Sequence, residues 1–304
     1  MRVAFFGTPA YAVPTLDALV EAGHEVVTVV AQPDKPVGRG RKLQSPPVIE
    51  RARALGLDTR QPRAVRTGRF PRRLAALDLD VGVVVAYGRI LTAALLGAPR
   101  LGCVNGHGSL LPRWRGAAPI QWSILSGDAV TGVTTMQMDE GLDTGDMLLK
   151  RALDIGPDET APQLAARMAT LTAALIVETL DQLDTLTPVP QDPALATHAR
   201  MLTKDDARLD FSRPAQALHD QVRALQPWPG AVCTLRGQPF KVKQTRVAEG
   251  EGPPGTALVA GSRLVIACGE GALEVLEGQL PGKKALPARD LVNGARIEPG
   301  EVFE

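Results

Sequence analysis

The chain has 304 residues, of which 44% are hydrophobic and 22% are charged, so it is long enough for two domains and too apolar to be disordered throughout. Its 34 basic and 33 acidic side chains give a net charge of +1, so the total charge indicates no particular partner. Only 4% of the residues are aromatic, which leaves few stacking surfaces for single-stranded nucleic acid.

The cysteines and the lack of long apolar runs indicate the kind of compartment in which the protein works. Cys103, Cys233 and Cys268 are odd in number and far apart, and no Cys-x-x-Cys pair begins a zinc site, so we expect a reducing compartment. The first apolar run is interrupted by Gly7 and Pro9, and the chain contains no run of about 18 apolar residues. We therefore expect a soluble, cytoplasmic protein that does not bind membranes.

Apolar runs alternate with helical patterns through the first half of the chain. The patterns predict strands at 2–7, 25–31, 80–86, 102–107 and 131–138, and helices at 11–21, 46–55, 118–127 and 160–186. Ser45 is the expected N-cap of the second helix, with Pro46 as its first residue. The alternation predicts an α/β fold with a doubly wound, mainly parallel sheet in a Rossmann-like domain over residues 1–186.

The pattern changes after the proline-rich stretch TPVPQDPA, which we expect to belong to a linker over residues 187–207. A short helix at 214–225 then precedes short strands with glycine turns, at 231–235, 240–247, 256–261, 263–268 and 272–278. This spacing predicts a small antiparallel, OB-like β-barrel over residues 208–304.

Basic residues are concentrated in two segments. Residues 34–73 contain twelve basic and three acidic side chains, and residues 200–246 contain nine and four. The loop PDKPVGRGRKLQSPP carries four of these basic residues, Lys35, Arg39, Arg41 and Lys42. Its prolines and glycines disfavour regular structure, and an exposed basic loop suits the phosphate backbone of a nucleic acid. For residues 51–73, simple solvation of an Arg-rich helix face is an equally good explanation.

Polar residues follow the ends of two predicted strands, where ligands bind in open parallel sheets. Asn105 and His107 stand two apart on the fourth strand and share a face, and the fifth strand leads into the acidic loop MDEGLDTGD. An amide can donate a hydrogen bond to a developing oxyanion, and a carboxylate can favour the charged form of an imidazole. The pattern is compatible with an acyl-transfer site, but also with a surface histidine and with Asn105, Asp143 or Asp146 acting as turn caps.

Two motifs then carry a family resemblance. The stretch NGHGSLLPRWRGAAPIQWSI, followed by MQMDEGLDTGDML, closely resembles the methionyl-tRNA formyltransferases. The similarity extends over nearly the whole chain, through FFGTP, QPDKPVGRGRKL, VVVAYGRIL, PWPGA and GKKAL. It implies transfer of the formyl group of 10-formyltetrahydrofolate, a co-substrate, to the amino group of methionine on initiator methionyl-tRNA. No metal is implied, because the folate already carries an activated formyl group, and we expect a monomer.

The resemblance also implies roles for individual residues. Asn105, His107 and Asp143 would be the catalytic residues. Our hypothesis is that Asn105 and a protonated His107 bind the oxyanion, that Asp143 stabilises the imidazolium, and that a water or Asp143 takes the ammonium proton. The folate site would be lined by Ser109, Leu110, Leu111 and Pro112, beside the turn formed by Ala86, Tyr87 and Gly88. The tRNA acceptor end would be entered by Lys35, Arg39, Arg41 and Lys42, and the second domain would hold the rest of the acceptor arm. Gly106 departs from the family, which usually has a branched apolar residue there, and we expect it to loosen the strand end.

Rival functions share parts of this pattern. A formyltransferase acting on a purine precursor or an amino sugar would use the same three catalytic residues, but the basic loop and the second domain favour a large polyanionic acceptor. A non-catalytic RNA-binding protein is disfavoured by the sparse aromatic residues. A nicotinamide oxidoreductase is disfavoured because FFGTPAY lacks the G-x-G-x-x-G fingerprint. A metal site at Cys103 and His107 matches no standard ligand spacing.

Overall fold

The computed structural model describes residues 1–38, 40–65 and 69–304, which form two compact units. Unit 1 contains residues 1–119, 131–154 and 165–199, and unit 2 contains residues 120–130, 155–164 and 200–304. This division differs from the expected domain limits, because residues 187–199 belong to unit 1 and two internal segments belong to unit 2. The segment 187–199 lies with unit 1 because its backbone bonds there: Val189 pairs with Met147, and the Arg115 N–H donates to the carbonyl of Thr197.

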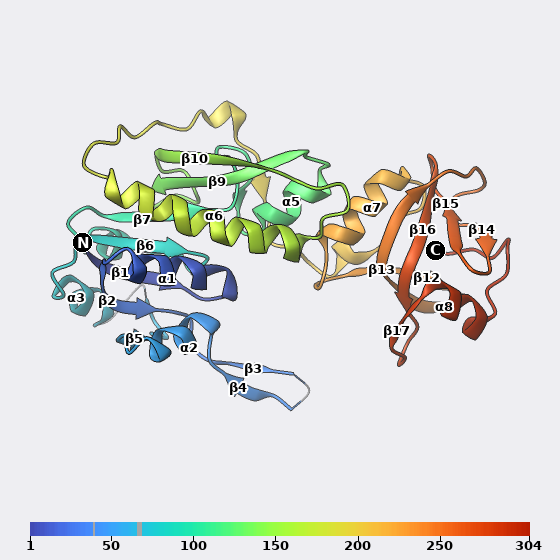
Figure 1. The fold of residues 1–304 in the computed structure, drawn as a ribbon, viewed down its shortest axis with the longest axis horizontal. Coiled ribbons are helices and arrows are strands. Elements are labelled where there is room, and N and C mark those ends of the chain that lie inside the picture. Colours follow the sequence, from blue (N-terminus) through green and yellow to red (C-terminus); the bar gives the residue numbers. More distant parts are fainter. Residues whose placement is uncertain (39, 66–68) are drawn as a thin grey trace. The chain divides into compact units, whose positions relative to one another are not determined.

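Unit 1 is built on a seven-stranded sheet with the strand order β10-β9-β7-β6-β1-β2-β5 (Figure 1). The strands are β1 (Arg2–Gly7), β2 (Glu25–Val30), β5 (Thr59–Arg60), β6 (Val81–Val85), β7 (Cys103–His107), β9 (Val130–Gln137) and β10 (Met147–Asp154). Strands β5, β2, β1, β6 and β7 run parallel to one another. The mainly parallel sheet expected from the sequence is therefore confirmed.

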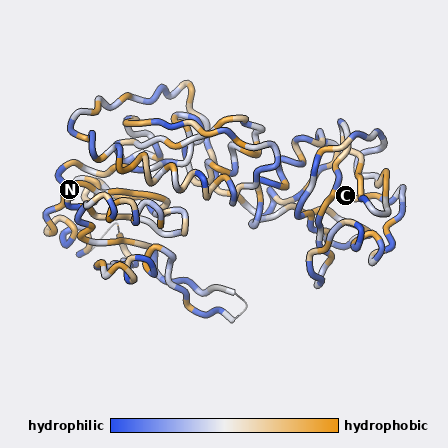
Figure 2. Tube along the Cα trace, viewed as in Figure 1, coloured by the Kyte–Doolittle hydropathy of each residue, from blue (hydrophilic) through white to orange (hydrophobic). Residues whose placement is uncertain are grey.

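Helices cover both faces of this sheet because alternate strand residues point to opposite sides. Val3 and Phe5 of β1 share a core with α1 (Val13–Glu21), α2 (Pro47–Ala54) and α6 (Ala161–Asp181). Ala4 and Phe6 share the other core with α3 (Phe70–Ala75) and α4 (Ala93–Leu96). The central strands are apolar along their length (Figure 2), which is typical of strands buried on both faces. The doubly wound arrangement is thus confirmed.

Two local expectations in unit 1 are wrong. The N-cap of α2 is Pro46, and the helix begins at Pro47, one residue later than expected from Ser45. A residue that precedes proline is driven out of the helical region, so Pro46 keeps an extended backbone with ψ 144. The fifth predicted strand, β9, runs antiparallel to β7, with Val104 opposite Gln137 and His107 opposite Thr134. Its carboxyl end therefore lies beside the beginning of β7.

The basic loop contains a short hairpin, where irregular structure was expected. Strands β3 (Lys35–Val37) and β4 (Lys42–Gln44) pair antiparallel, and Lys35, Arg41 and Lys42 are exposed. Proline is tolerated because Pro36 sits in a ribbon of only two strands, where its missing N–H is not needed. Arg39 lies outside the described residues.

Unit 2 is an antiparallel sheet with the order β12-β13-β16-β15-β14 and β17 added to β16. Its strands are β12 (Ala231–Leu235), β13 (Gln238–Ala248), β14 (Ala257–Ala260), β15 (Leu264–Ala267), β16 (Ala272–Gln279) and β17 (Ala285–Pro287). Near the C-terminus, Phe303 bridges to Leu235 of β12 and Val302 bridges to Thr256 beside β14, so one segment links the two edge strands. The sheet is curled into a half-barrel, as the short strands predicted.

Two helices pack against this sheet and share its core. Leu218 and Val222 of α7 (Ala215–Ala224) and Leu291 of α8 (Ala288–Ala295) share one core with Phe240 and Phe303. The remaining elements are α5 (Pro119–Leu125), the short strands β8 (Arg115–Gly116) and β11 (His198–Ala199), and the single 3-10 turns η1 (Ala10–Ala12), η2 (Pro193–Leu195) and η3 (Asp205–Ala207). The sequence patterns did not predict β10, β17 or α8. No helix among the described residues is long and apolar enough to cross a membrane.

One ion-pair cluster on the half-barrel predicts a pH-dependent stability. Glu274 is 3% exposed, and hydrogen bonds from Arg263 and then Arg246 lower its pKa to about 2 from an ordinary 4.5. A lowered pKa stabilises the folded state above pH ~4.5, and this stabilisation is lost as the pH falls toward ~2. Because both arginines are half exposed, we expect about 1–2 kcal/mol at neutral pH.

Glu274→Gln is therefore expected to lower the free energy of unfolding by that amount at pH 7, and by progressively less toward pH 3. Urea titrations at a series of pH values measure the difference. Glu277→Gln, on the same strand, is the matched control and should leave the pH dependence unchanged. A constant deficit across the pH range would contradict the assignment.

Candidate active site

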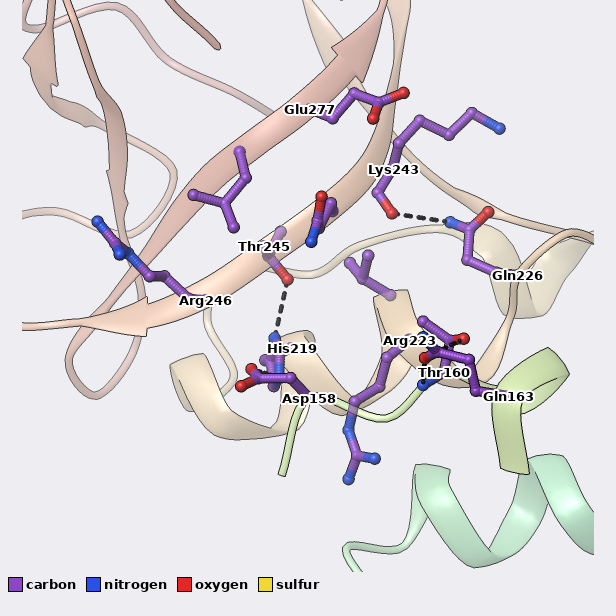
Figure 3. A pocket seen from close by; sticks show the side chains of 13 residues that line it. Asp158, Thr160, Gln163, His219, Arg223, Gln226, Lys243, Thr245, Arg246 and Glu277 are labelled. Carbon is purple, nitrogen blue, oxygen red and sulfur yellow. Dashed lines mark hydrogen bonds and ion pairs between the residues drawn. The ribbon is translucent and has the colours of Figure 1, made fainter. Parts of the chain in front are cut away.

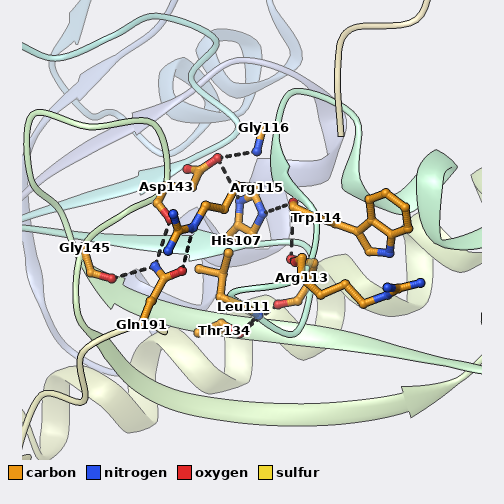
Figure 4. Close-up of polar contacts among 11 residues, drawn as sticks. His107, Leu111, Arg113, Trp114, Arg115, Gly116, Thr134, Asp143, Gly145 and Gln191 are labelled. Carbon is orange, nitrogen blue, oxygen red and sulfur yellow. Dashed lines mark hydrogen bonds and ion pairs between the residues drawn. The ribbon is translucent and has the colours of Figure 1, made fainter. Parts of the chain in front are cut away.

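His107 lies at the end of β7 and is 6% exposed, with both ring nitrogens facing protein oxygens (Figure 4). Its Nε2 is 2.9 Å from the carbonyl oxygen of Trp114, and because a carbonyl only accepts, Nε2 carries a hydrogen and donates it. Its Nδ1 is 3.7 Å from Oδ2 of Asp143, close enough for an ion pair but longer than a hydrogen bond. Nδ1 is therefore the ring atom available to a substrate.

Asp143 is held from three directions in the loop between β9 and β10. Its backbone is left-handed, with φ +54, a conformation that aspartate tolerates better than most residues. The carboxylate Oδ2 accepts a hydrogen bond from the Gly116 N–H at 2.7 Å. The Gln191 amide donates to the carbonyl oxygens of Asp143 and Gly145 at 2.8 and 2.7 Å. The carboxylate therefore has a fixed position beside the imidazole.

Asn105 stands two residues before His107 on β7, so both side chains extend from the same face of the strand. It is half-buried, and its side-chain amide has no hydrogen-bond partner anywhere in the described parts of the chain. The structure thus brings together His107 and Asp143 and leaves the donor capacity of Asn105 unused. This arrangement suits stabilisation of an oxyanion next to a group that takes up a proton.

The loop between β7 and β8 fixes the imidazole through a strained residue. Trp114 has φ +62, which costs a bulky residue about 1–3 kcal/mol. Its N–H donates to Oγ1 of Thr197 at 2.9 Å, and the guanidinium of Arg113 lies 4.6 Å from the centre of its ring. The Ser109 hydroxyl donates to the Arg113 carbonyl at 2.6 Å and closes the loop. These contacts hold the Trp114 carbonyl where His107 meets it.

Of the four loop residues expected to contact folate, two are buried in the protein and hold the loop in place. Ser109 and Leu111 are buried, and the Thr134 hydroxyl joins them, because it accepts from Leu111 N at 3.0 Å and donates to Ser109 O at 2.8 Å. Leu110 and Pro112 keep partly exposed surface. A contact between folate and this loop therefore falls most naturally on Leu110 and Pro112.

The turn after β6 also contains both exposed and buried residues. Ala86 and Gly88 are exposed and left-handed, with φ +47 and +75, whereas the Tyr87 side chain is 2% exposed and lies in the core. The Gln32 amide donates to the carbonyls of Tyr87 and Gly88, and the Thr8 hydroxyl also donates to Tyr87. The φ of +75 at position 88 favours glycine, because side chains are strained in this conformation.

Gly106 is closely packed by α6, whereas the sequence led us to expect a looser strand end. A Cβ at this position would lie 2.6 Å from Cγ2 of Thr172 on α6, so the Thr172 methyl already fills the space. The Thr172 hydroxyl is 2.8 Å from the Tyr11 hydroxyl, and burial raises the pKa of Tyr11 to about 12. The strand end is thus packed by the helix rather than by its own side chain.

Residues that sequence reasoning missed complete the site. Gln191 and Thr197 hold the two loops, but they lie in the segment 187–207 that was interpreted as a linker, whose composition carried no sign of this role. Arg115 is 8% exposed and donates from Nε to Gln191 at 2.9 Å. Lys150 donates to the Leu111 carbonyl, and burial lowers its pKa. Within the described ranges, no three His, Cys, Asp or Glu side chains are close enough to ligate a metal ion.

A separate cavity of about 660 Å³ lies within unit 2 and contains none of the predicted site residues (Figure 3). Its buried His219 bonds to Oγ1 of Thr245 at 3.0 Å and to the Pro157 carbonyl at 3.2 Å. Its Arg223 is paired with Asp220. His219 also pairs with Asp158 at 3.2 Å, so both of these buried side chains have partners within unit 2.

Family comparisons agree with the division of the chain. Residues 1–180 match the family described as Formyl transferase, and residues 201–296 match Formyl transferase, C-terminal domain. A methionyl-tRNA formyltransferase from Anaeromyxobacter dehalogenans is 53% identical over 304 residues, covering 97% of each chain. One from Solibacter usitatus is 49% identical, covering 99% of this chain and 98% of that protein.

Among solved structures, an N-formyltransferase from Helicobacter canadensis, in complex with folinic acid and dTDP-3-aminofucose, has a TM-score of 0.68. It covers 90% of this chain and 98% of its own, at 15% sequence identity. At that identity the likeness supports the fold alone.

The packing at Gly106 gives a direct test. Gly106→Ala is expected to lower the free energy of unfolding by about 1–3 kcal/mol, because the new Cβ overlaps the Thr172 methyl. Thr172→Ser removes that methyl and keeps the hydroxyl that meets Tyr11, so the double variant should recover most of the loss. Denaturant titrations of the four proteins measure the coupling. Additive losses would show that the methyl is not the obstacle.

Proposed function

The chain belongs to the methionyl-tRNA formyltransferase family and is an enzyme of formyl transfer, and on this basis we propose that it transfers the formyl group of 10-formyltetrahydrofolate to the amino group of methionine on initiator tRNA. The product, formylmethionyl-tRNA, serves translation initiation, and we place the enzyme in the cytoplasm. The observation that carries the proposal is the pairing of His107 with Asp143 on the face of β7 where Asn105 has an unused amide.

The reaction needs a neutral amine, an activated carbonyl carbon and somewhere for a proton to go. The methionyl nitrogen attacks the formyl carbon, and the carbonyl electron pair moves to oxygen to give a tetrahedral oxyanion. The bond from the formyl carbon to N10 of the folate then breaks. The amine loses one proton and N10 gains one, so the products are the formamide and tetrahydrofolate.

Three side chains take the roles in this scheme. Asn105 donates its amide hydrogen to the oxyanion, and His107 as imidazolium donates from Nδ1, the nitrogen not engaged by Trp114. Asp143 faces Nδ1 across 3.7 Å, where it stabilises the imidazolium and takes the proton from the incoming ammonium group. The Gly116 N–H keeps Oδ2 directed into this space.

We assign the other contacts with the folate and the tRNA to residues whose side chains are exposed. Leu110 and Pro112, with the turn at Ala86 and Gly88, offer the accessible surface for the folate. The hairpin carrying Lys35, Arg41 and Lys42, together with Arg39, provides the positive charge for the tRNA acceptor end. The half-barrel of unit 2 holds the remainder of the acceptor arm. Each of these cations that contacts a phosphate releases a counterion from the tRNA, and this release contributes to the affinity.

Removing the imidazole tests the catalytic assignment. His107→Ala is expected to lower kcat for formyl transfer by about 10²–10³, because one oxyanion donor is lost, with a much smaller change in KM for either substrate. Initial rates with 10-formyltetrahydrofolate and charged initiator tRNA measure it, and circular dichroism checks the fold. His198→Ala is the matched control, because His198 is exposed. Near-normal kcat in a folded His107→Ala protein would overturn the mechanism.

The hairpin gives an independent test of tRNA binding. Replacing Lys35, Arg41 and Lys42 by glutamine should raise KM for the tRNA about tenfold or more and leave KM for the folate unchanged. The plot of log affinity against log salt should become shallower by up to about 2, because as many as three phosphate contacts are lost.

The control removes the same charge elsewhere in unit 1. Glutamine at Arg69, Arg72 and Arg73, which are exposed at the start of and along α3, should change the salt dependence far less. Equal effects of the two triple variants would mean that general charge, and not the hairpin, attracts the tRNA.

A further inference from the structure

Arg115 is a buried cation whose hydrogen-bonding capacity is largely unused. Its residue is 8% exposed, and its Nε donates to Oε1 of Gln191 at 2.9 Å. No acceptor for Nη1 or Nη2 occurs among residues 1–38, 40–65 and 69–304, and neither atom is sealed from solvent. Both terminal nitrogens are therefore unpaired donors that keep some contact with solvent.

A second buried arginine in this chain has more partners than Arg115. Arg223 is 6% exposed, and its Nε contacts Oδ1 of Asp220 at 2.8 Å. Its Nη1 donates to the carbonyls of Gly156 and Glu159 at 3.3 and 2.9 Å. A buried charge without such partners costs several kcal/mol, so the same degree of burial at Arg115 indicates an anion that is supplied from outside the chain.

Gln191 fixes where this anion must lie. The same amide side chain that accepts from Arg115 also donates to the carbonyls of Asp143 and Gly145. Gly116, the next residue after Arg115, donates to the Asp143 carboxylate. Figure 4 shows the Arg115 side chain extending toward Asp143 and Gln191. The unused donors are thus on the side of the site where Asp143 meets the attacking amine.

We propose that Arg115 binds the last phosphate of the acceptor tRNA, the one that precedes the terminal nucleoside. This inference rests on the proposed function. The terminal nucleoside carries both the methionyl ester and this phosphate, so the phosphate enters the site together with the amine. The carboxylates of the folate stand at its glutamate end, separated from N10 by the aminobenzoyl group. A guanidinium with two free parallel donors matches a phosphate in bidentate geometry.

A double-mutant cycle between enzyme and tRNA tests this contact. One tRNA carries an uncharged methylphosphonate at its last internucleotide linkage, and a control tRNA carries it one linkage earlier. We expect the wild-type enzyme to lose about tenfold or more in kcat/KM with the first tRNA and much less with the second. Arg115→Gln should lose a similar factor with ordinary tRNA, and the two losses should not add.

Two further comparisons remove the alternatives. Arg113→Gln takes the same charge from the same loop, where Arg113 is exposed over Trp114, and should leave the methylphosphonate effect intact. With the amide of 10-formyltetrahydropteroate, a donor that carries no carboxylate, the Arg115→Gln defect should persist. If it disappears, the donor carboxylate is the bound anion and the phosphate assignment is wrong.

Other results of the same experiments would overturn either the phosphate contact or the proposed function. Additive losses, or a wild-type enzyme indifferent to the terminal methylphosphonate, would overturn the proposal, and the latter measurement stands even if Arg115→Gln does not fold. Absence of formyl transfer by the wild-type enzyme to ordinary methionyl-tRNA would instead refute the proposed function, so the two failures are distinguishable.

Discussion

The site depends on a single hydrogen bond, from Nε2 of His107 to the carbonyl of Trp114. This bond fixes the ring and assigns the hydrogen on Nε2, so only Nδ1 faces Asp143 and the substrate. It requires a left-handed tryptophan, whose strain of about 1–3 kcal/mol is offset by hydrogen bonds worth about 1 kcal/mol each. One of these comes from Trp114 itself to Thr197, far along the chain.

The segment 187–199 therefore supports the candidate site. Gln191 connects the Asp143 loop to Arg115, and Thr197 supports the Trp114 loop, so one stretch of chain holds both sides of the imidazole. The same segment leads directly into the part of unit 2 that begins at Arg200.

Much of the architecture follows from local pattern. The strands at 2–7 and 81–85 are apolar on both faces, which is possible only between two helical layers, and glycine turns separate the short strands of the half-barrel. Elements that depend on their neighbours were harder to predict. Strand β10 has a polar, exposed outer edge, and its polar and apolar residues alternate little. Helix α8 is short, and its few apolar residues indicate a helix only once they are seen to pack against the core of unit 2.

By itself, the sequence determined the two-part organisation and the alternation of strands and helices. It also determined which chemical groups Asn105, His107 and Asp143 offer, because residue type and spacing are local properties. Only the tertiary structure decided how these groups meet. Strand β9 runs antiparallel to β7, so the acidic loop starts at the far end of β7 and must fold back for Asp143 to reach His107. Likewise, the closeness of α6 explains Gly106, since no local pattern reports which side chain occupies the space that a missing Cβ leaves.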